Sequence, residues 1–405
     1  LGFLIMQTVP FTLADKDVEN FTQEIMALRR AANERMSIDD FKHLKKIERW
    51  GKLSTLAGYG TAWIAPNPIS AFLMSQGNVT RWTTIAHHVL HKGFDKIEGI
   101  PERYTSKGFA KGWRRFLDWN DWMLPEAWSN EHNKLHHYNL GEAADPDQVE
   151  LNLEWLRDSK LPMPLRYAVV ALFAATWKPL YYAPNTLKHL TSTKNNVLGE
   201  ERDSATLTQL ALWNPLNPAA RDLWSKCLLP YIFVKFVLIP LAFTPLGPIA
   251  VINVWINTLL AEIISNLHAF LVIVPNHVGN DILLFEDVAN NKSEFFLRQI
   301  TGSTNFKTGG DLNDMLHGWL NYQIEHHLWP DLPMSEYQRL QPQVKALCEK
   351  YGIPYVQESV WVRLKKTVDV MVGNSSMPRQ KSVSSNKRSQ TSTQHPKSTP
   401  EIISA

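Results

Sequence analysis

The sequence predicts an all-α protein, an integral-membrane helical bundle of about four transmembrane helices with a helical cap. Three observations support this class: long apolar stretches, Pro- and Gly-rich turns between them, and charged flanking segments with helical spacing. The chain also has 15 tryptophans, which an aromatic belt at a membrane surface would use. Its 405 residues are 44% hydrophobic, enough for a large core. The net charge of +3 argues against nucleic acid as a partner.

The N-terminal part, residues 1–52, is predicted to be a soluble amphipathic segment. Residues 15–50 are rich in Glu, Lys and Arg, and they carry apolar side chains at helical spacing, such as Phe21, Ile25 and Leu28. This pattern predicts one or two helices that precede the membrane.

Residues 53–372 are predicted to form the membrane domain with its cap, and this domain begins with a helical hairpin. The sequence turns apolar at its start, breaks at Pro66 and Pro68, and resumes as far as His91. Each arm of the hairpin would cross the membrane once. Between residues 92 and 161 the chain becomes polar and aromatic, which predicts a cap at the membrane surface.

Three further apolar stretches follow, residues 161–183, 228–243 and 246–275. One metal site can gather histidines from both sides of these stretches only if an even number of crossings separates them. The first stretch contains Arg166 and several prolines, so we expect it to lie at the membrane interface. The other two stretches then form a second hairpin, which a Pro- and Gly-rich turn at residues 244–248 reverses on the far side.

The C-terminal part is predicted to lie outside the membrane. Residues 281–314 are a polar connection, and a helix over 315–330 should end at Pro330, with two histidines in its last turn. Amphipathic patterns then predict two soluble helices, over residues 335–348 and 359–371. Residues 373–405 consist mainly of Ser, Thr, Gln, Lys and Pro, which predicts a disordered tail. Its Lys and Arg favour the cytosolic face, where the histidines would also lie.

Eight of the 14 histidines fall in three short clusters. The clusters are HHVLH at residues 87–91, HNKLHH at 132–137 and the end of QIEHH at 323–327. On a helix, His132 and His136 would share one face, an arrangement that suits a metal ion. One such cluster could be a polar helix surface without metal, but unrelated surface histidines would be scattered along the chain.

His277 joins the candidates because it follows the last apolar stretch, on the same side as the three clusters. His268 lies two or more turns deeper, and we expect it to be a buried, hydrogen-bonded group. Since a structural zinc ion takes four ligands, eight imidazoles suit two metal ions better than one. The candidate metal ligands and catalytic residues are His87, His91, His132, His136, His137, His277, His326 and His327.

The ligand type restricts the chemistry but does not choose the metal, because imidazole binds iron, zinc, copper and nickel. Only two cysteines occur, Cys227 and Cys348, which argues against a disulfide framework or a thiolate site. A pair of nitrogen-bound ions beside apolar helices suits oxidation of a hydrocarbon by dioxygen. The sequence has neither a nucleophile elbow nor an HExxH motif that would indicate hydrolysis.

The three clusters, with LWPDLP after the third and YGIPYV further on, resemble the integral-membrane fatty acid desaturases. The QIEHH box is closest to that of the front-end acyl-lipid and acyl-CoA subgroup, and the likeness covers residues 82–355, including the DPD at 145–147. It implies a four-helix membrane bundle, a cytosolic cap, and two Fe ions in a non-haem diiron centre. It also implies an O2-dependent removal of two hydrogens from a fatty acyl lipid or acyl-CoA.

The resemblance also assigns the histidines, box by box. His87 and His91 match the first box, His132, His136 and His137 the second, and His326 and His327 the third. His277 matches an additional histidine that the family places after its last membrane helix. Gln323 stands where other subgroups have a histidine, and we do not expect it to be a direct ligand.

The chain departs from the family pattern at three places. His88 stands where many members have an acidic residue, so it either binds metal or only forms hydrogen bonds. His317 replaces a small residue. The HPGG haem motif of a fused cytochrome b5 domain is missing, and His395-Pro396 is the only His-Pro pair. We therefore expect a separate electron donor, a ferredoxin or a cytochrome b5 with its reductase.

The donor would dock on a basic patch of the cap, unless these charges only meet lipid headgroups. The patch consists of Lys107, Lys111, Arg114 and Arg115. Two other functions stay open: a related diiron hydroxylase or monooxygenase of an alkyl, sphingoid or carotenoid substrate, and a non-catalytic zinc-binding membrane protein. The sequence does not show which carbon would be oxidised or what carries the acyl chain.

Overall fold

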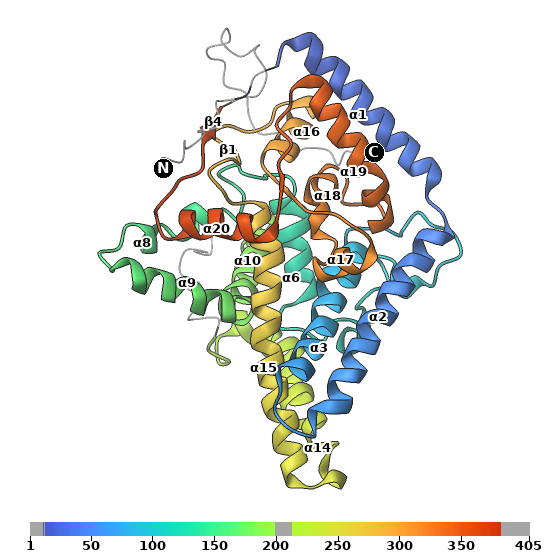
Figure 1. Ribbon diagram of the computed structural model, residues 1–405, viewed down its shortest axis with the longest axis vertical. Helices are drawn as coiled ribbons and strands as arrows, with labels where there is room; N and C mark the ends of the chain where they lie inside the picture. The colour runs from blue at the N-terminus through green and yellow to red at the C-terminus, as the bar shows by residue number, and fades with distance from the viewer. Residues whose placement is uncertain (1–10, 12, 199–212, 382–405) are drawn as a thin grey trace.

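The computed structural model describes residues 11, 13–198 and 213–381. Helices make up most of these residues, as predicted, and the chain tapers from a broad cap to a narrow tip (Figure 1). The named strands are only two residues long and pair in parallel, β1 with β4 and β2 with β3. They are β1 (Leu284–Phe285), β2 (Asn305–Phe306), β3 (Gln357–Glu358) and β4 (Arg379–Gln380).

The first predicted hairpin is present near the tip. α2 (Ile38–Ala62) and α3 (Pro68–Val79) form its arms, and the side chain of Asn67 caps the start of α3. Asn257 of α15 (Pro248–Ile273) donates from its amide to the carbonyls of Ala62, the last residue of α2, and Ala65 in the following loop. This buried amide therefore provides a partner for a carbonyl at the end of α2, where the helix itself provides none.

α2 runs straight through the boundary that we predicted between residues 52 and 53. It begins with a capping box made by Ser37 and Asp40. Its lower half exposes apolar side chains, including Leu53 and Leu56, as a helix facing lipid would. The charged N-terminal part and the apolar part thus belong to one continuous helix.

The second predicted hairpin is also present. Its arms are Arg221–Leu246 and Pro248–Asn276, and by length and composition each could cross a membrane. No other helix within the described ranges meets that test, so the two crossings by α2 and α3 stay a prediction. The chain reverses at η10 (Thr244–Leu246) and Gly247, whose φ of 96° favours glycine. The first arm contains α12 (Arg221–Leu223), η8 (Trp224–Leu228), α13 (Leu229–Phe233), η9 (Val234–Leu238) and α14 (Ile239–Leu241).

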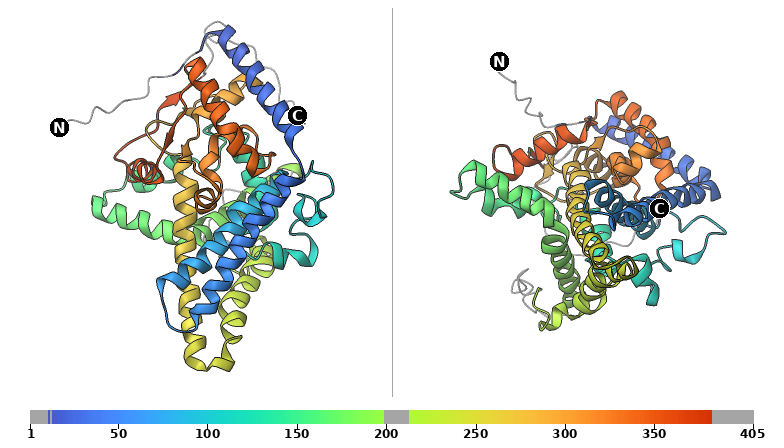
Figure 2. Two further views of the ribbon diagram at one scale, coloured as in Figure 1. Left: turned by 45° about the vertical axis from the view of Figure 1, so that its right-hand side comes forward. Right: turned by 60° about the horizontal axis from the view of Figure 1, so that its bottom comes forward.

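Residues 161–183 form part of a helix that follows a different direction. α9 (Met163–Trp177) leads through the π-helical η5 (Lys178–Tyr182) into α10 (Ala183–Leu198). Figures 1 and 2 show α9 lying across α15 rather than along it. This direction agrees with the predicted interfacial helix, whose position relative to a membrane stays a prediction.

The polar connection predicted over residues 281–314 is more ordered than the sequence suggested. It contains α16 (Lys292–Thr301), β2 and α17 (Asp311–Leu316). α16 starts where the side chain of Asn291 accepts a hydrogen bond from the Glu294 N–H, and it buries Leu297 and Ile300 completely. Only four of its ten residues are apolar, so the helix depends on packing against the cap.

The single helix predicted over residues 315–330 is broken in two. Trp319 adopts a left-handed conformation with φ 60° and is fully buried, and η12 (Leu320–Tyr322) and α18 (Gln323–Leu328) follow it. Burial of the indole outweighs the cost of this backbone conformation. The last turn of α18 still contains His326 and His327, as predicted.

The two predicted C-terminal helices are α19 (Met334–Tyr351) and α20 (Val360–Met371). The start of the predicted tail, residues 373–381, is packed against the cap instead of being disordered: β4 pairs with β1, and the Gln380 amide donates to the Phe11 carbonyl at 2.7 Å. Residues 382–405 lie outside the described residues. The other cap helices are α1 (Asp15–Arg35), α4 (His87–Leu90), α5 (Arg115–Asp118), α6 (Pro125–Asn130), α7 (Val149–Asn152) and α8 (Glu154–Arg157).

Candidate metal centre

The first histidine cluster lies where the first hairpin enters the cap. α3 continues through the π-helical η1 (Thr80–Ala86) into α4. His87 and His91 are one helical turn apart, and their ring centroids are separated by 4.8 Å. His88 between them instead donates from Nδ1 to the carbonyl of Thr84, at 2.7 Å.

The second cluster lies on η4 (Glu131–His136), a π-helical turn rather than the predicted α-helix. The His137 N–H donates to the carbonyl of His132 at 3.1 Å, five residues back. The rings of His132 and His136 do lie next to each other, stacked at 5.3 Å, as predicted. The wider turn also brings the ring centroid of His137 to 4.8 Å from that of His132. Insertions of this kind are frequent at functional sites.

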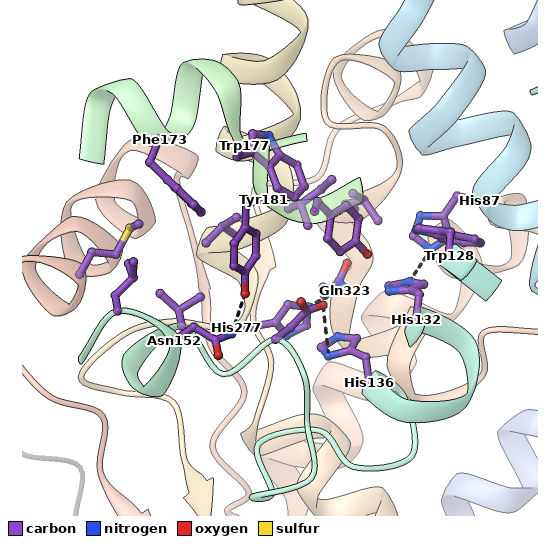
Figure 3. Close-up of a pocket in the computed structure, with 18 of the residues that line it drawn as sticks. His87, Trp128, His132, His136, Asn152, Phe173, Trp177, Tyr181, His277 and Gln323 are labelled. Carbon is purple, nitrogen blue, oxygen red and sulfur yellow. Dashed lines mark hydrogen bonds and ion pairs between the residues drawn. The ribbon is translucent and has the colours of Figure 1, made fainter. Parts of the chain in front are cut away.

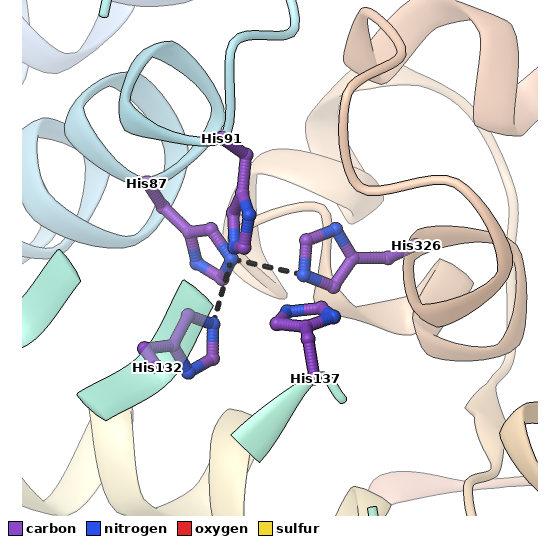
Figure 4. A group of neighbouring side chains, drawn as sticks. All are labelled: His87, His91, His132, His137 and His326. Carbon is purple, nitrogen blue, oxygen red and sulfur yellow. Dashed lines mark hydrogen bonds between the residues drawn. The ribbon is translucent and has the colours of Figure 1, made fainter. Parts of the chain in front are cut away.

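All eight predicted histidines come together, and they divide into two groups. Within each group, one potential ligand atom per residue lies within 4.8 Å of the others. The five-histidine group combines all three boxes, as Figure 4 shows: His87, His91, His132, His137 and His326. The three-histidine group consists of His136, His277 and His327. All eight are buried except His277, which is partly buried.

The donor atoms in these groups fit a bound metal. The Nε2 of His87 faces the Nε2 of His326 at 3.0 Å and that of His132 at 3.3 Å. In the part of the chain that the structure describes, the Nε2 atoms of His91, His137 and His327 have no hydrogen-bond partner. Buried polar atoms without partners are costly, and metal ions are suitable partners for several imidazoles at once.

The protonation states point the same way. Burial, reinforced by the neighbouring imidazoles, holds the pKa of His132, His137, His326 and His327 well below the ordinary value. These imidazoles are therefore neutral near pH 7. Neutral imidazole is the form that binds a metal ion.

Side chains around the two groups orient the imidazoles. His136 Nδ1 lies 2.9 Å from an oxygen of Asp145, whose other oxygen accepts the Gly141 N–H. His327 Nδ1 lies 3.0 Å from Gln299 Oε1. Such contacts hold a metal-binding imidazole in one tautomer and one orientation. Asp145 is in the DPD motif quoted above, whereas nothing in the sequence pointed to Gln299 on α16.

Gln323 and the three other histidines discussed above, His88, His268 and His317, lie outside the two groups. The amide nitrogen of Gln323 is 2.9 Å from His277 Nε2, so the side chain contacts the centre without belonging to it. His268 donates to the Leu316 carbonyl, as predicted, but it is only partly buried and not buried as we expected. His317 donates to a carbonyl one turn back in α17. His88 is fully buried, and only its Nδ1 has a partner among the described residues.

Two carboxyl groups next to the centre, the buried Glu131 and the partly buried Asp147, had no predicted role. Asp147 approaches the ligand atoms of His132 and His136 to within 4.8 Å, and burial raises the pKa of Asp147 to about 6. Burial and the charge of Asp147 also raise the pKa of Glu131, which accepts a hydrogen bond from Tyr182 at 3.1 Å. A cation bound beside these groups would lower both pKa values and so favour the ionised carboxylates.

An apolar pocket opens against both groups of histidines. It encloses about 860 Å³ of space, including its open part, and His87, His132, His136 and His277 form one side of it. Aromatic rings make up much of the remaining wall: Trp82, Trp128, Phe173, Trp177, Tyr181 and Tyr182. Figure 3 labels four of them, Trp128, Phe173, Trp177 and Tyr181. A long apolar molecule could therefore lie directly beside the imidazoles.

A membrane-associated oxidoreductase with an apolar substrate is expected to combine apolar helices, clustered imidazoles in a cap and an apolar pocket beside them. Residues 61–359 match the model of the fatty acid desaturase family, and the chain belongs to this family. The resemblance inferred from the histidine boxes is thereby confirmed.

The curated relatives include both acyl-CoA and acyl-lipid desaturases. An NADPH-dependent stearoyl-CoA 9-desaturase of Mycobacterium tuberculosis is 27% identical over 375 residues, which cover 88% of this chain and 79% of the relative. An acyl-lipid (7-3)-desaturase of Rebecca salina is 27% identical over 276 residues, 63% of this chain and 54% of the relative. An acyl-lipid (9-3)-desaturase of Physcomitrium patens is 33% identical over 99 residues, 24% of this chain and 18% of the relative.

Proposed function

We propose that this protein is an O2-dependent fatty acyl desaturase that introduces a double bond into a fatty acyl lipid or acyl-CoA. The observation that carries the proposal is the convergence of five and three histidines beside an apolar pocket, which four of them line. The histidines of the two groups would hold two iron ions, one per group. When bound, the irons would supply the activation of dioxygen and the oxidising power for removing two hydrogens.

The protein itself positions the substrate and excludes water. Trp82, Trp177 and Tyr182 are buried at the pocket wall, so a methylene chain in the pocket is shielded from solvent on that side. His87, His132 and His136 line the same pocket, which brings the C–H bonds of such a chain next to the candidate metal sites. A saturated chain has no reactive group, so this placement decides which carbon reacts.

The electrons set a further requirement. Reduction of dioxygen to two waters takes four electrons, of which the two C–H bonds of the substrate supply two. The other two must reach the metals from outside these 405 residues, which contain no flavin, haem or iron–sulfur motif. We propose a ferredoxin, or a cytochrome b5 with its reductase, as the donor. The Mycobacterium tuberculosis relative is named as NADPH-dependent, and we propose NADPH as the ultimate reductant here too.

We propose that the electron donor docks on the basic patch, although carboxylates neutralise two of its four positive charges. Arg114 pairs with Asp118, and Arg115 pairs with Glu126 at 2.6 Å. Lys107 and Lys111 are exposed, and we propose that they carry the attraction for an acidic donor.

We also propose that the chain is a multi-pass membrane protein with its centre facing the cytosol. The two hairpins would each cross twice, with α9 lying at the interface. The exposed apolar side chains of both hairpins support this arrangement, among them Leu56 on α2, Phe233 on α13 and Ile252 on α15.

The test is expression of the full chain in a host of defined lipid composition, followed by localisation of double bonds in its fatty acids. A new double bond that His326→Ala abolishes would support the proposal. Addition of one oxygen without loss of hydrogen would identify the alternative, a hydroxylase of the same family. No new product, together with tightly bound zinc, would favour a non-catalytic zinc protein.

A further inference from the structure

Tyr181 and Asn152 place a polar pair in the otherwise apolar part of the pocket. Tyr181 comes from η5 and Asn152 from the end of α7. In Figure 3 this pair lies on one side of His277, and His132 and His87 lie on the other. Apart from Asp147, whose charge acts on Tyr181, the pocket residues of this region are largely apolar: Val149, Leu153, Phe173, Ile273, Val274 and Met371.

The hydrogen bonds of this pair leave one donor unused. Asn152 donates both amide hydrogens, one to the Pro146 carbonyl at 2.8 Å and one to the Tyr181 hydroxyl at 2.9 Å. The Tyr181 oxygen is thus an acceptor in its contact with Asn152. Within the described ranges its own hydrogen has no acceptor, and the hydroxyl lines the pocket.

The neighbouring tyrosine makes a useful contrast. Tyr182 also lines the pocket, but its hydroxyl donates to Glu131 at 3.1 Å and is already engaged. Burial and the charge of Asp147 raise the pKa of Tyr181, so its hydroxyl keeps its proton near pH 7. Asn152 fixes the phenol from outside, while the O–H remains available to a ligand.

We propose that the Tyr181 hydroxyl binds the carbonyl oxygen of the acyl substrate and so sets the position of the chain relative to the histidines. This rests on the proposed function. An acyl chain carries a single strong hydrogen-bond acceptor, the carbonyl at its head. In an apolar pocket, a donor placed at that point stabilises the bound substrate. Glycerolipid esters and CoA thioesters share this carbonyl, so the chemistry is the same for both sources.

The first test measures binding to the purified, metal-loaded full chain. The probes are stearoyl-CoA and its S-alkyl thioether analogue, and a diacyl phosphatidylcholine and its dialkyl ether analogue. Tyr181→Phe should weaken binding of the carbonyl-containing member of one pair about five- to tenfold, the worth of one neutral hydrogen bond. It should leave binding of the carbonyl-free member unchanged. The pair that responds identifies the source of the acyl chain.

The matched control is Tyr167→Phe. Tyr167 on α9 also accepts a hydrogen bond from an asparagine, Asn374 at 3.0 Å, but it lies outside the pocket lining. This variant should bind all four probes like the wild type. An equal loss of affinity in both variants, or an equal loss for probes with and without the carbonyl, would overturn the proposal.

The second test localises the double bonds in products. Without its anchor the chain can slide, so Tyr181→Phe should yield a mixture of double-bond positions with a raised KM, whereas a purely structural defect would lower kcat at one position. An active wild type with an unchanged Tyr181→Phe variant would refute the carbonyl site and leave the desaturase proposal intact. An inactive wild type whose binding of carbonyl-containing probes still depends on Tyr181 would refute the desaturase proposal and leave the carbonyl site intact. Failure of every probe to bind would overturn the carbonyl site as well.

Discussion

The Nε2 atoms of His87 and His326 lie 3.0 Å apart, although 239 positions separate the two residues. The first and third histidine boxes therefore meet at one point inside the cap. Two ring nitrogens at this distance form a hydrogen bond only if one of them carries a proton. Both residues belong to the five-histidine group. The group should accordingly depend on each box.

His326→Ala removes one member of this group and no apolar helix. We expect product formation to fall by more than about a hundredfold, since even loss of a supporting side chain costs 10- to 100-fold in comparable sites. Membrane insertion should be unchanged. His317→Ala is the matched control, because His317 belongs to neither group and its ring donates to the carbonyl of Asn313 in α17. Equal activity of the two variants, measured by fatty acid analysis, would contradict the assignment.

Asp145 should act through His136. The carboxylate accepts from His136 Nδ1 at 2.9 Å, so Asp145→Asn weakens the orientation of that imidazole without removing it. We expect metal affinity and turnover to fall about 10- to 100-fold. Asp158→Asn, at an exposed carboxylate after α8, should have no effect. A wild-type iron content and rate in Asp145→Asn would exclude this role.

The proposed topology can be tested by labelling single cysteines in sealed vesicles. Thr244→Cys lies at the tip of the second hairpin, and Ser192→Cys lies on α10 after the proposed interfacial helix. Thr244→Cys should react only from the side opposite the histidines, and Ser192→Cys only from the histidine side. The native Cys227 and Cys348 are buried and should give little background. Labelling of both sites from the same side would mean that residues 161–183 cross the membrane.

The electron donor should be a separate molecule that Lys107 and Lys111 help to bind. The double variant Lys107→Glu/Lys111→Glu should raise the KM for an acidic ferredoxin or cytochrome b5 several-fold at low salt, with a smaller effect at high salt. Lys16→Glu, on the exposed side of α1, controls for net charge. An unchanged KM would remove this docking site. Sustained turnover with NADPH alone would remove the need for the donor.

Much of the candidate site could be predicted because local rules apply to it. The eight histidines stand in short clusters, and the Pro and Gly of residues 244–248 do reverse the chain. His326 and His327 do end a helix just before Pro330. Each of these depends on neighbouring residues only.

The remainder depended on tertiary contacts. The division into five and three histidines follows from the π-helical turn at His132, which an i, i+4 pattern cannot reveal. Gln299 reaches His327 from α16, a helix that exists because it packs on the cap. Trp319 breaks the helix before the third box because its indole is buried. None of these contacts has a signal in the local sequence.

The most direct test of the account is the metal content of the purified full chain. We expect about two irons per protein, because two separate histidine groups are present and each would hold one ion. His277→Ala, which changes only the three-histidine group, should retain about one iron. A single tightly bound zinc with no iron in the wild type would contradict the diiron centre, and with it the proposed chemistry.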